Sequence, residues 1–243
     1  MKISYIIPVY NIPQWMLDEC LASIEAVFTL MGKSMDHEII VVEDTRHEGA
    51  SVTRNRGIEQ ATGDYIHFVD ADDALIVDEY VHCLNLLEEK RPDLLALNFT
   101  TDKQRVKQGR VCFEGSGAKF LMHHNLHSGN GFHIFRRALL GDDLRFVPGI
   151  RHEDERMTPQ IYLRAKCVIA TNIMAYFYRQ REGSLQHAFS PNDIKERLSD
   201  IRANIRFLRS LHQKALRRRI IQLHLDYVVV FLKLRVFQKF LKP

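Results

Sequence analysis

Three carboxylates stand within four positions of one another in the segment HFVDADDAL. Asp70, Asp72 and Asp73 directly follow the apolar run YIHFV at 65–69. Like charges this close repel one another, and a hard divalent cation can neutralise them, because Mg²⁺ takes one or two carboxylates together with substrate phosphates. Asp is also favoured at the start of a helix, where it caps backbone N–H groups. The pattern by itself leaves a metal–phosphate site and a helix cap open.

A second acidic run, HEDE at 152–155, carries Asp154 between Glu153 and Glu155. A positioned carboxylate can take the proton from an attacking hydroxyl and so act as a general base. Three successive acids are also typical of a solvated turn. The residue types alone do not decide between a base and a turn.

Basic residues follow a late apolar strand in the segment YFYRQREGSLQH at 176–187. This segment contains Arg179, Arg181 and His187. The planar guanidinium fork of arginine matches phosphate oxygens, which favours a phosphate-binding loop. A basic surface loop is the competing interpretation.

Alternating strands and helices must position these residues. Apolar runs predict strands at 3–9, 37–44, 65–69 and 93–99, and helical spacing predicts helices at 17–31, 53–61 and 78–90. Strands that are apolar on both faces and alternate with helices predict a Rossmann-like α/β fold with a mainly parallel sheet flanked by helices. Residues 166–180 predict strands of a second lobe. Ligands gather at the carboxyl ends of such strands, where Asn11, Asp44 and the Asp70 segment fall.

Composition excludes several classes of protein. The 243 residues are 46% hydrophobic and 26% charged, which is ordinary for a globular chain and unlike a disordered one. The four cysteines lack the spacing of a metal site and fit reduced thiols. The apolar run at the N-terminus is too short for a signal peptide, and no stretch approaches the ~18 apolar residues of a membrane span. A cytoplasmic protein is expected.

The C-terminal part of the sequence is strongly basic. Residues 195–243 carry 13 Lys+Arg against 3 Asp+Glu, whereas residues 1–194 carry 21 against 27. A helix is predicted from about 214 to 241, with an apolar stripe of Leu216, Ile220, Leu223, Tyr227, Val230, Leu234, Phe237 and Leu241. Such a helix could lie on the anionic inner face of a membrane, or it could pack on the body or on a second copy of the chain. Most of its aromatic residues belong to the apolar stripe, so nucleic-acid binding is not expected.

Five segments together resemble the family 2 glycosyltransferases, which have a GT-A fold. In family order they are ISYIIPVYN, IIVVED, TRNRGIEQATGDYIHFVDADD, HEDERM and YFYRQREGSLQH. The resemblance runs from Ile3 to about Ser184. It implies a GT-A domain over residues 1–192, with a nucleotide-sugar-binding half at 1–100 and an acceptor-binding half at 101–192. A basic amphipathic helical tail at 193–243 follows.

The resemblance assigns one group of residues to the nucleotide. It implies that Pro8, Tyr10 and Asn11 line the base and ribose pocket and that Asp44 holds the base. Arg54 would lie near the nucleotide, while a solvated helix face is the alternative for that residue.

The resemblance also implies a metal site and a base. Asp70 and Asp72 belong to a DxD-type element in which Asp72 points toward the ribose or the metal. Asp73, with His187 as a further candidate, is the expected direct ligand of Mg²⁺ or Mn²⁺. Arg179 and Arg181 would belong to a loop that closes over the diphosphate.

Asp154 matches the general base of the family. A base on the face opposite the leaving diphosphate implies inversion at the anomeric carbon. The predicted function is therefore inverting transfer of a sugar from a nucleoside-diphosphate sugar, with a UDP-sugar as the expected donor. The acceptor is a hydroxyl of a cell-surface polysaccharide, a lipopolysaccharide or their lipid carrier. A catalytically silent nucleotide-sugar-binding or scaffold protein on the same fold is the alternative.

One segment departs from the family pattern. Only TRHEGASV separates Asp44 from Thr53, where the family usually has a further helix and strand, and Glu43 stands where Asp is more common. The shortening removes part of one wall of the nucleotide pocket, so the pattern does not fix the base of the donor. The shortened segment would also leave one edge of the sheet uncovered, and a second subunit could cover that edge.

Overall fold

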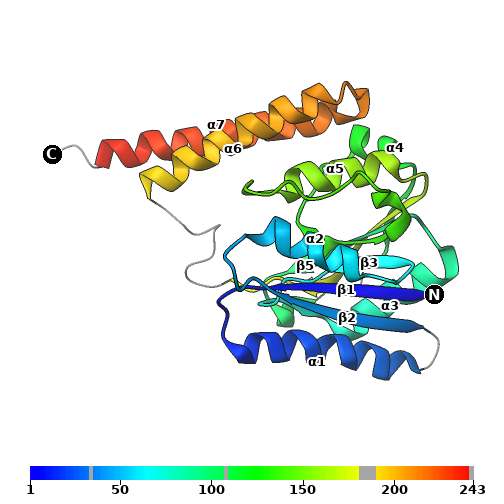
Figure 1. The fold of residues 1–243 in the computed structure, drawn as a ribbon. Coiled ribbons are helices and arrows are strands. Elements are labelled where there is room, and N and C mark those ends of the chain that lie inside the picture. Colours follow the sequence, from blue (N-terminus) through cyan, green and yellow to red (C-terminus); the bar gives the residue numbers. More distant parts are fainter. Residues whose placement is uncertain (33–34, 107–108, 181–189, 241–243) are drawn as a thin grey trace.

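A mixed sheet lies at the centre of the computed structural model, which describes residues 1–32, 35–106, 109–180 and 190–240 (Figure 1). Its described strands are β1 (Lys2–Val9), β2 (Asp36–Glu43), β3 (Tyr65–Phe68), β4 (Ala74–Leu75), β5 (Leu94–Thr100), β6 (Val111–Gly115), β7 (His133–Arg136) and β8 (Val168–Phe177). The order is β2-β1-β3-β7-β5-β8-β4, and β6 pairs with β8. Strands β1, β2, β3, β5 and β8 share one direction, while β4, β6 and β7 run the opposite way. The predicted α/β fold is confirmed.

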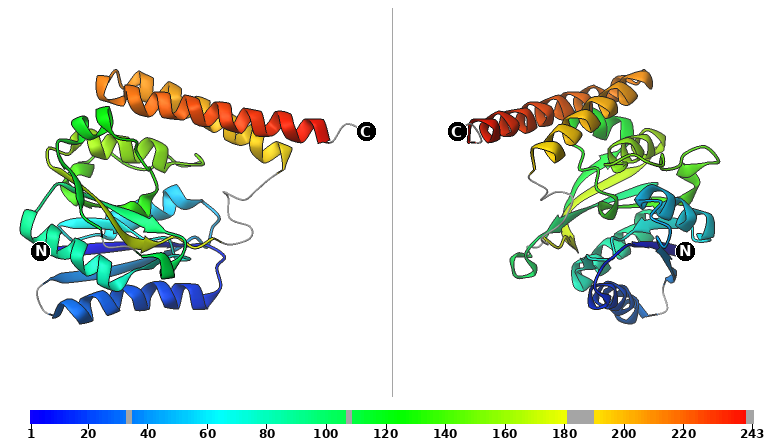
Figure 2. Two further views of the ribbon diagram at one scale, coloured as in Figure 1. Left: turned by 180° about the vertical axis from the view of Figure 1, so that it is seen from behind. Right: turned by 60° about the vertical axis from the view of Figure 1, so that its left-hand side comes forward.

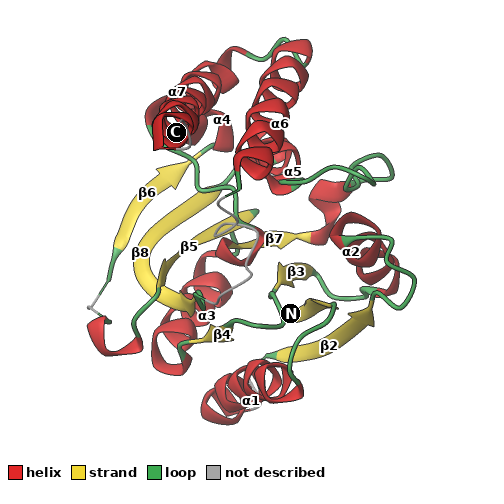
Figure 3. Cartoon of the chain, turned by 90° about the vertical axis from the view of Figure 1, so that its left-hand side faces the viewer, coloured by secondary structure: helices red, strands yellow, loops and turns green. Residues whose placement is uncertain are grey.

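Helices cover both faces of this sheet. The described helices are α1 (Gln14–Met31), α2 (Ala50–Gln60), α3 (Val77–Lys90), α4 (Gly117–His123), α5 (Asp154–Arg164), α6 (Pro191–Ser210) and α7 (Arg217–Phe240), with short 3₁₀ turns η2 (Lys103–Arg105), η3 (Asn130–Phe132), η4 (Arg137–Leu140) and η6 (Lys214–Leu216). Because side chains alternate across a strand, Ile3, Tyr5 and Ile7 of β1 pack toward α1 and α3, whereas Ile6 packs toward α2. Figure 3 shows α1 and α3 on one side of the sheet and α4 to α7 on the other.

The prediction of a second lobe at 166–180 is wrong. Residues Val168–Phe177 form the single long strand β8, which pairs with β5 in the common sheet. Most of β8 is buried, which explains why its sequence is apolar on both faces. Its neighbour β6 lies at an edge and is half exposed, so its sequence pattern is weak.

The basic tail folds as two helices that lie side by side and cross the body over α4 and α5 (Figures 1 and 2). We call α6, η6 and α7 the C-terminal hairpin. Helix α6 begins at a capping box, in which Ser190 and Asp193 satisfy each other's backbone N–H groups. The first part of the predicted apolar stripe points inward, since Leu216 and Leu223 are fully buried in one core cluster with the body. Phe237 and Leu241 lie outside the side chains that the structure describes. Of the three alternatives for this stripe, packing on the body is therefore confirmed for its first part.

A polar cluster fastens the hairpin to α5, and we call it the hairpin anchor. It consists of Glu155, Arg197, Asn204 and Arg219. The Glu155 carboxylate, only 5% exposed, accepts hydrogen bonds from Arg197 at 2.6 Å and Asn204 at 2.7 Å, with Arg219 at 3.8 Å. Burial raises the pKa of Glu155, but the hydrogen bond and charge of Arg197 outweigh it and hold the pKa below its usual value.

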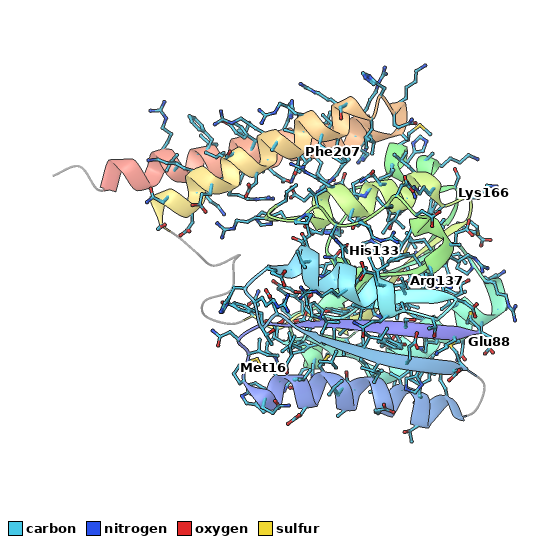
Figure 4. All side chains as sticks on the ribbon, viewed as in Figure 1. Met16, Glu88, His133, Arg137, Lys166 and Phe207 are labelled. Carbon is cyan, nitrogen blue, oxygen red and sulfur yellow. The ribbon has the colours of Figure 1, made fainter. Side chains whose placement is uncertain are left out.

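Helix α5 is therefore enclosed on two sides. Figure 4 shows His133 on the sheet side of α5 and Phe207 on the hairpin side. The ring of His133 meets that of Tyr162 edge-on at 5.5 Å, and the guanidinium of Arg156 lies 5.1 Å from the Phe207 ring centre. Among the described helices, none combines the length and the apolarity that crossing a membrane requires.

Candidate active site

A cavity of about 940 Å³ opens where β1, β3 and β8 end, and the C-terminal hairpin forms part of its wall. Eight of the residues predicted from the sequence line it: Tyr10, Asn11, Arg54, Asp70, Asp72, Asp73, Asp154 and Arg179. Pro8 and Asp44 do not line it, and Arg181 and His187 lie outside the described residues. The fold thus brings acids from the two predicted carboxylate runs into one cavity.

The acidic segment Asp70–Asp73 forms a turn after β3, in which the Asp73 N–H donates to the Asp70 carbonyl at 2.9 Å. Asp73 is 1% exposed and accepts from the Tyr176 hydroxyl at 2.7 Å and the Arg179 N–H at 2.8 Å. Burial, with the charges of Asp70 and Asp72, raises the pKa of Asp73 to about 8. Helix α3 starts later, with Ile76 at its cap and no side-chain cap bond, so the helix-cap interpretation is wrong.

A divalent cation suits the chemistry of this segment. Among the described residues, no group of three or more His, Cys, Asp and Glu is arranged to enclose an ion. One or two carboxylates suffice when phosphate oxygens complete the shell of Mg²⁺. Asp70 and Asp72 both line the cavity, whereas both oxygens of Asp73 already accept hydrogen bonds. The residues fit a cation held mainly by Asp70 and Asp72, and direct ligation by Asp73, expected from the resemblance, stays a prediction.

Arg54 joins the two acidic runs. It lies on α2, is 6% exposed, and donates to Asp70 at 2.7 Å and to Glu153. Gly57 allows this approach, because a Cβ there would lie 2.2 Å from the side chain of Ile6 on β1. The solvated helix face considered for Arg54 is therefore wrong, since the close packing of α2 on β1 buries that face.

Asp154 is the first residue of α5 and directly follows Glu153, which Arg54 connects to Asp70. Burial, followed by the charges of Glu153 and Glu155, raises the pKa of Asp154 to about 7, although a hydrogen bond from Ser128 acts in the other direction. A carboxyl with such a pKa can exchange a proton near neutral pH. The solvated-turn interpretation of HEDE is also wrong, because Glu155 belongs to the buried hairpin anchor.

Of the residues predicted to contact the base and ribose, Tyr10 and Asn11 line the cavity and Asp44 does not. Asn11 has a left-handed backbone, with φ of 45°, and the exposed Tyr10 ring pairs its hydroxyl with His47 at 3.0 Å. Asp44 is 8% exposed and accepts from the N–H groups of Glu48 and Gly49, so it orders the loop before α2. Burial raises the pKa of Asp44, but these two hydrogen bonds lower it below its usual value. Contact between Asp44 and a base stays a prediction.

Arg179 is fixed by several contacts beside the acidic segment. Its guanidinium donates to the Asp72 carbonyl at 2.7 Å, pairs with Glu19, and lies 5.1 Å from the Trp15 ring centre. The sequence analysis did not identify Glu19 or Tyr176, which orient the acidic segment from α1 and β8. Glu19 lies in no quoted motif, and Tyr176 opens the segment YFYRQREGSLQH, whose basic residues gave the only functional signal there, so the fold reveals both roles.

The model of "Glycosyl transferase family 2" matches residues 30–143. The glycosyltransferase GlyA of Streptococcus pneumoniae serotype 4 is 29% identical over 227 residues, which are 78% of this chain but 32% of GlyA. This chain therefore spans about a third of that relative's length.

Solved structures share the fold. The structure of S. aureus TarS 1–349 with UDP-GlcNAc has a TM-score of 0.62 and 21% identity, covering 94% of this chain and 72% of that one. The mannosyltransferase PcManGT of Pyrobaculum calidifontis, with GDP-Man and Mn²⁺, has a TM-score of 0.60 and 14% identity, covering 96% and 73%. The family match over residues 30–143, the curated relatives and this shared architecture support a family 2 glycosyltransferase with the GT-A fold.

Proposed function

We propose that this chain is an inverting glycosyltransferase that moves a sugar from a nucleoside-diphosphate sugar to a hydroxyl. The observation that carries the proposal is one cavity with Asp70 and Asp72 in its wall and Asp154 at the start of α5, joined through Arg54. A UDP-sugar is the expected donor, and TarS, a relative in fold, binds UDP-GlcNAc. The acceptor belongs to a cell-surface polysaccharide or lipopolysaccharide pathway.

The donor occupies the side of the cavity that residues 1–100 build. Tyr10 and Asn11 lie at the end of β1, where a nucleotide would meet backbone and aromatic surface. Asp70 and Asp72 would hold Mg²⁺ or Mn²⁺, which when bound neutralises charge on the diphosphate leaving group. Arg54 keeps Asp70 in place on this side, and Arg179 holds the Asp72 backbone.

The acceptor occupies the side that residues 101–192 and the hairpin build. Its attacking hydroxyl must lose a proton as the new C–O bond forms, and Asp154 takes this proton. Its raised pKa suits that task, because a weaker acid is a stronger base. Attack from the face opposite the diphosphate inverts the anomeric centre.

Thermal unfolding with nucleotides tests the donor side. UDP with Mn²⁺ or Mg²⁺ is expected to raise the midpoint of the wild type by about 5–10 °C at saturating concentration. Asp72→Asn loses the metal-dependent part, because one carboxylate of the cavity wall is gone. The matched control is Asp142→Asn, which changes an exposed acid outside the cavity wall and is expected to behave as wild type. Parallel measurements with GDP, CMP and dTDP identify the base.

The same measurement separates the active enzyme from a silent relative. Metal-dependent stabilisation without sugar transfer to any acceptor indicates a nucleotide-sugar-binding scaffold. No stabilisation by any nucleotide contradicts the donor site itself.

We also propose that the outer face of α7 contacts an anionic lipid surface at the inner side of the cytoplasmic membrane. This face consists of Ile221, Leu225, Val228 and Leu232, which are 52–62% exposed and follow helical spacing. The exposed cations Arg217, Arg218 and Arg235 flank it, and its four members include no acid. Apolar side chains bordered by cations complement anionic headgroups. It is a different face of α7 from the apolar stripe predicted from the sequence.

Sedimentation with vesicles tests this contact. The wild type is expected to bind phosphatidylglycerol-containing vesicles and not pure phosphatidylcholine, and a triple change of Leu225, Val228 and Leu232 to Ser abolishes binding. The matched control changes Leu30, Met122 and Val147 to Ser, three exposed apolar side chains elsewhere, and keeps binding. If wild type and the α7 triple variant sediment equally, the proposal fails. A concentration-dependent dimer that only the α7 variant loses would instead assign the face to a second copy.

A further inference from the structure

The C-terminal hairpin contributes an unexplained polar pair to the cavity. Arg197 and Asp200 both line it and lie one turn apart on α6, so their side chains share one face of that helix. The hairpin anchor holds this part of α6 against α5, because Arg197 donates to Glu155 at 2.6 Å. Glu155 directly follows Asp154 in the chain. The pair therefore lines the same cavity as the proposed base.

One atom of each side chain has no hydrogen-bond partner among the residues that the structure describes. These atoms are Nη1 of Arg197 and Oδ2 of Asp200, and both are shielded from bulk solvent. A buried polar atom without a partner costs about 1–3 kcal/mol, so native proteins rarely keep one without a ligand or water to meet it. A hydrogen-bond donor and a hydrogen-bond acceptor, each without a described partner, therefore both belong to residues in the wall of the cavity.

The charges that the hairpin contributes to this wall are balanced. From the hairpin, Arg197 and Lys233 line the cavity as cations, and Asp193 and Asp200 line it as anions. Glu155 further offsets Arg197. A phosphate or carboxylate would meet Asp200 as a like charge, whereas a hydroxyl group can donate to Asp200 and accept from Arg197 at once.

We infer that Arg197 and Asp200 form a subsite for an uncharged, hydroxyl-rich segment of the acceptor, such as a sugar or polyol unit. The inference rests on the proposed function and extends it, because it gives the C-terminal hairpin a direct part in acceptor recognition. Neighbouring hydroxyls of the acceptor bind this pair, and the hydroxyl to be glycosylated lies toward Asp154.

The experiment compares Asp200→Ala with Asp226→Ala. Both carboxylates are partly buried on the hairpin with pKa values raised chiefly by burial, but Asp226 does not line the cavity. UDP release from UDP-GlcNAc and UDP-glucose is measured without an acceptor probe, with methyl α-D-glucopyranoside or sorbitol, and with glucose 6-phosphate or sorbitol 6-phosphate. Arg197 is left intact, because its loss would also break the hairpin anchor.

The neutral probes are expected to accelerate UDP release by the wild type. Asp200→Ala raises the KM for these probes about tenfold or more, as loss of a hydrogen bond to a charged group predicts. Release without a probe stays within about twofold of wild type, and Asp226→Ala behaves as wild type throughout. The thermal midpoint of Asp200→Ala does not fall, because Oδ2 has no described partner and burial outweighs the attraction of neighbouring cations, which leaves the pKa of Asp200 raised.

The results distinguish failure of the proposed function from failure of the acceptor subsite alone. A wild type that never releases UDP contradicts the proposed function, and the inference with it. Donor hydrolysis that no neutral probe accelerates overturns the inference alone. So do equal probe kinetics of Asp200→Ala and Asp226→Ala, or a lower KM for the phosphorylated probes than for the neutral ones.

Discussion

Replacing Asp154 with asparagine is expected to lower the rate of sugar transfer by about 10²–10⁴-fold, the usual contribution of a general base. Asparagine keeps the size of the side chain but cannot take the proton of the acceptor hydroxyl. Stabilisation by the donor nucleotide and metal stays as in wild type, because Asp70 and Asp72 are unchanged. Asp142→Asn is again the matched control. Transfer by Asp154→Asn within about twofold of wild type would exclude this residue as the base.

The pH dependence of the wild type supplies an independent check. Asp154 acts as a base only when ionised, and its pKa is raised to about 7. Below that pH the value of kcat/KM should fall about tenfold per unit, and above it a plateau is expected. The Asp154→Asn variant keeps a low rate without this step. A step near pH 4 would instead indicate a carboxyl with an ordinary pKa.

Asp154→Asn should also stabilise the fold, because the pKa of Asp154 is higher in the folded state than in the unfolded state. Between the ordinary Asp pKa of 3.8 and about 7, the folded state holds a proton that the unfolded state has lost, so rising pH weakens the wild type. Asparagine removes this effect. The thermal midpoint of Asp154→Asn should therefore exceed that of wild type most clearly at pH 8, and the gain should shrink toward pH 4. A variant less stable than wild type at pH 8 contradicts the raised pKa.

Replacing Arg54 with methionine is expected to cost about 3–5 kcal/mol of unfolding free energy, as breaking a buried ion pair usually does. Methionine has a comparable length but leaves Asp70 and Glu153 without their shared cation. Denaturant unfolding measures the loss, and transfer activity falls with it because both acidic runs lose their connection. Lysine at this position should rescue only part of either property, because a single ammonium lacks the fork that reaches two carboxylates.

Arg56 offers a matched control for Arg54. It lies on the same helix, pairs with Glu48, and keeps about a third of its side chain exposed. Arg56→Met should cost at most about 1 kcal/mol, because exposed ion pairs contribute little. If both substitutions cost the same, the burial and the bridging role of Arg54 are contradicted.

The sequence predicted the fold well where its pattern is regular. Strand β1 and helix α1 follow from a β-branched run and from helical spacing, and both are present with small changes at their ends. Strand β7 was not predicted, because four residues of an antiparallel strand carry too short a pattern. The sequence does not predict that β8 joins the common sheet, because an apolar run carries no information on which strand it pairs with.

The candidate site was predictable mainly through the family resemblance. It led to Asp70, Asp72 and Asp154, which the fold brings to one cavity, while their roles stay predictions. The contacts of Arg54 with Asp70 and Glu153 could not be foreseen, because Arg54 and Glu153 are 99 positions apart. Asp200 had no motif at all and becomes notable only when α6 is placed over the cavity.

The hairpin anchor has a consequence for how the protein is made. Glu155 meets Arg197 and Arg219 only after the ribosome has synthesised and released the segment that carries them. Until then the nascent chain holds a carboxylate on α5 without the cations that later neutralise it. Strands β1, β2 and β3 can pair early during translation, as N-terminal parts generally do, but the helix that carries the proposed base acquires its final surroundings late. Catalytic competence should therefore arise late in synthesis, well after these N-terminal strands have folded.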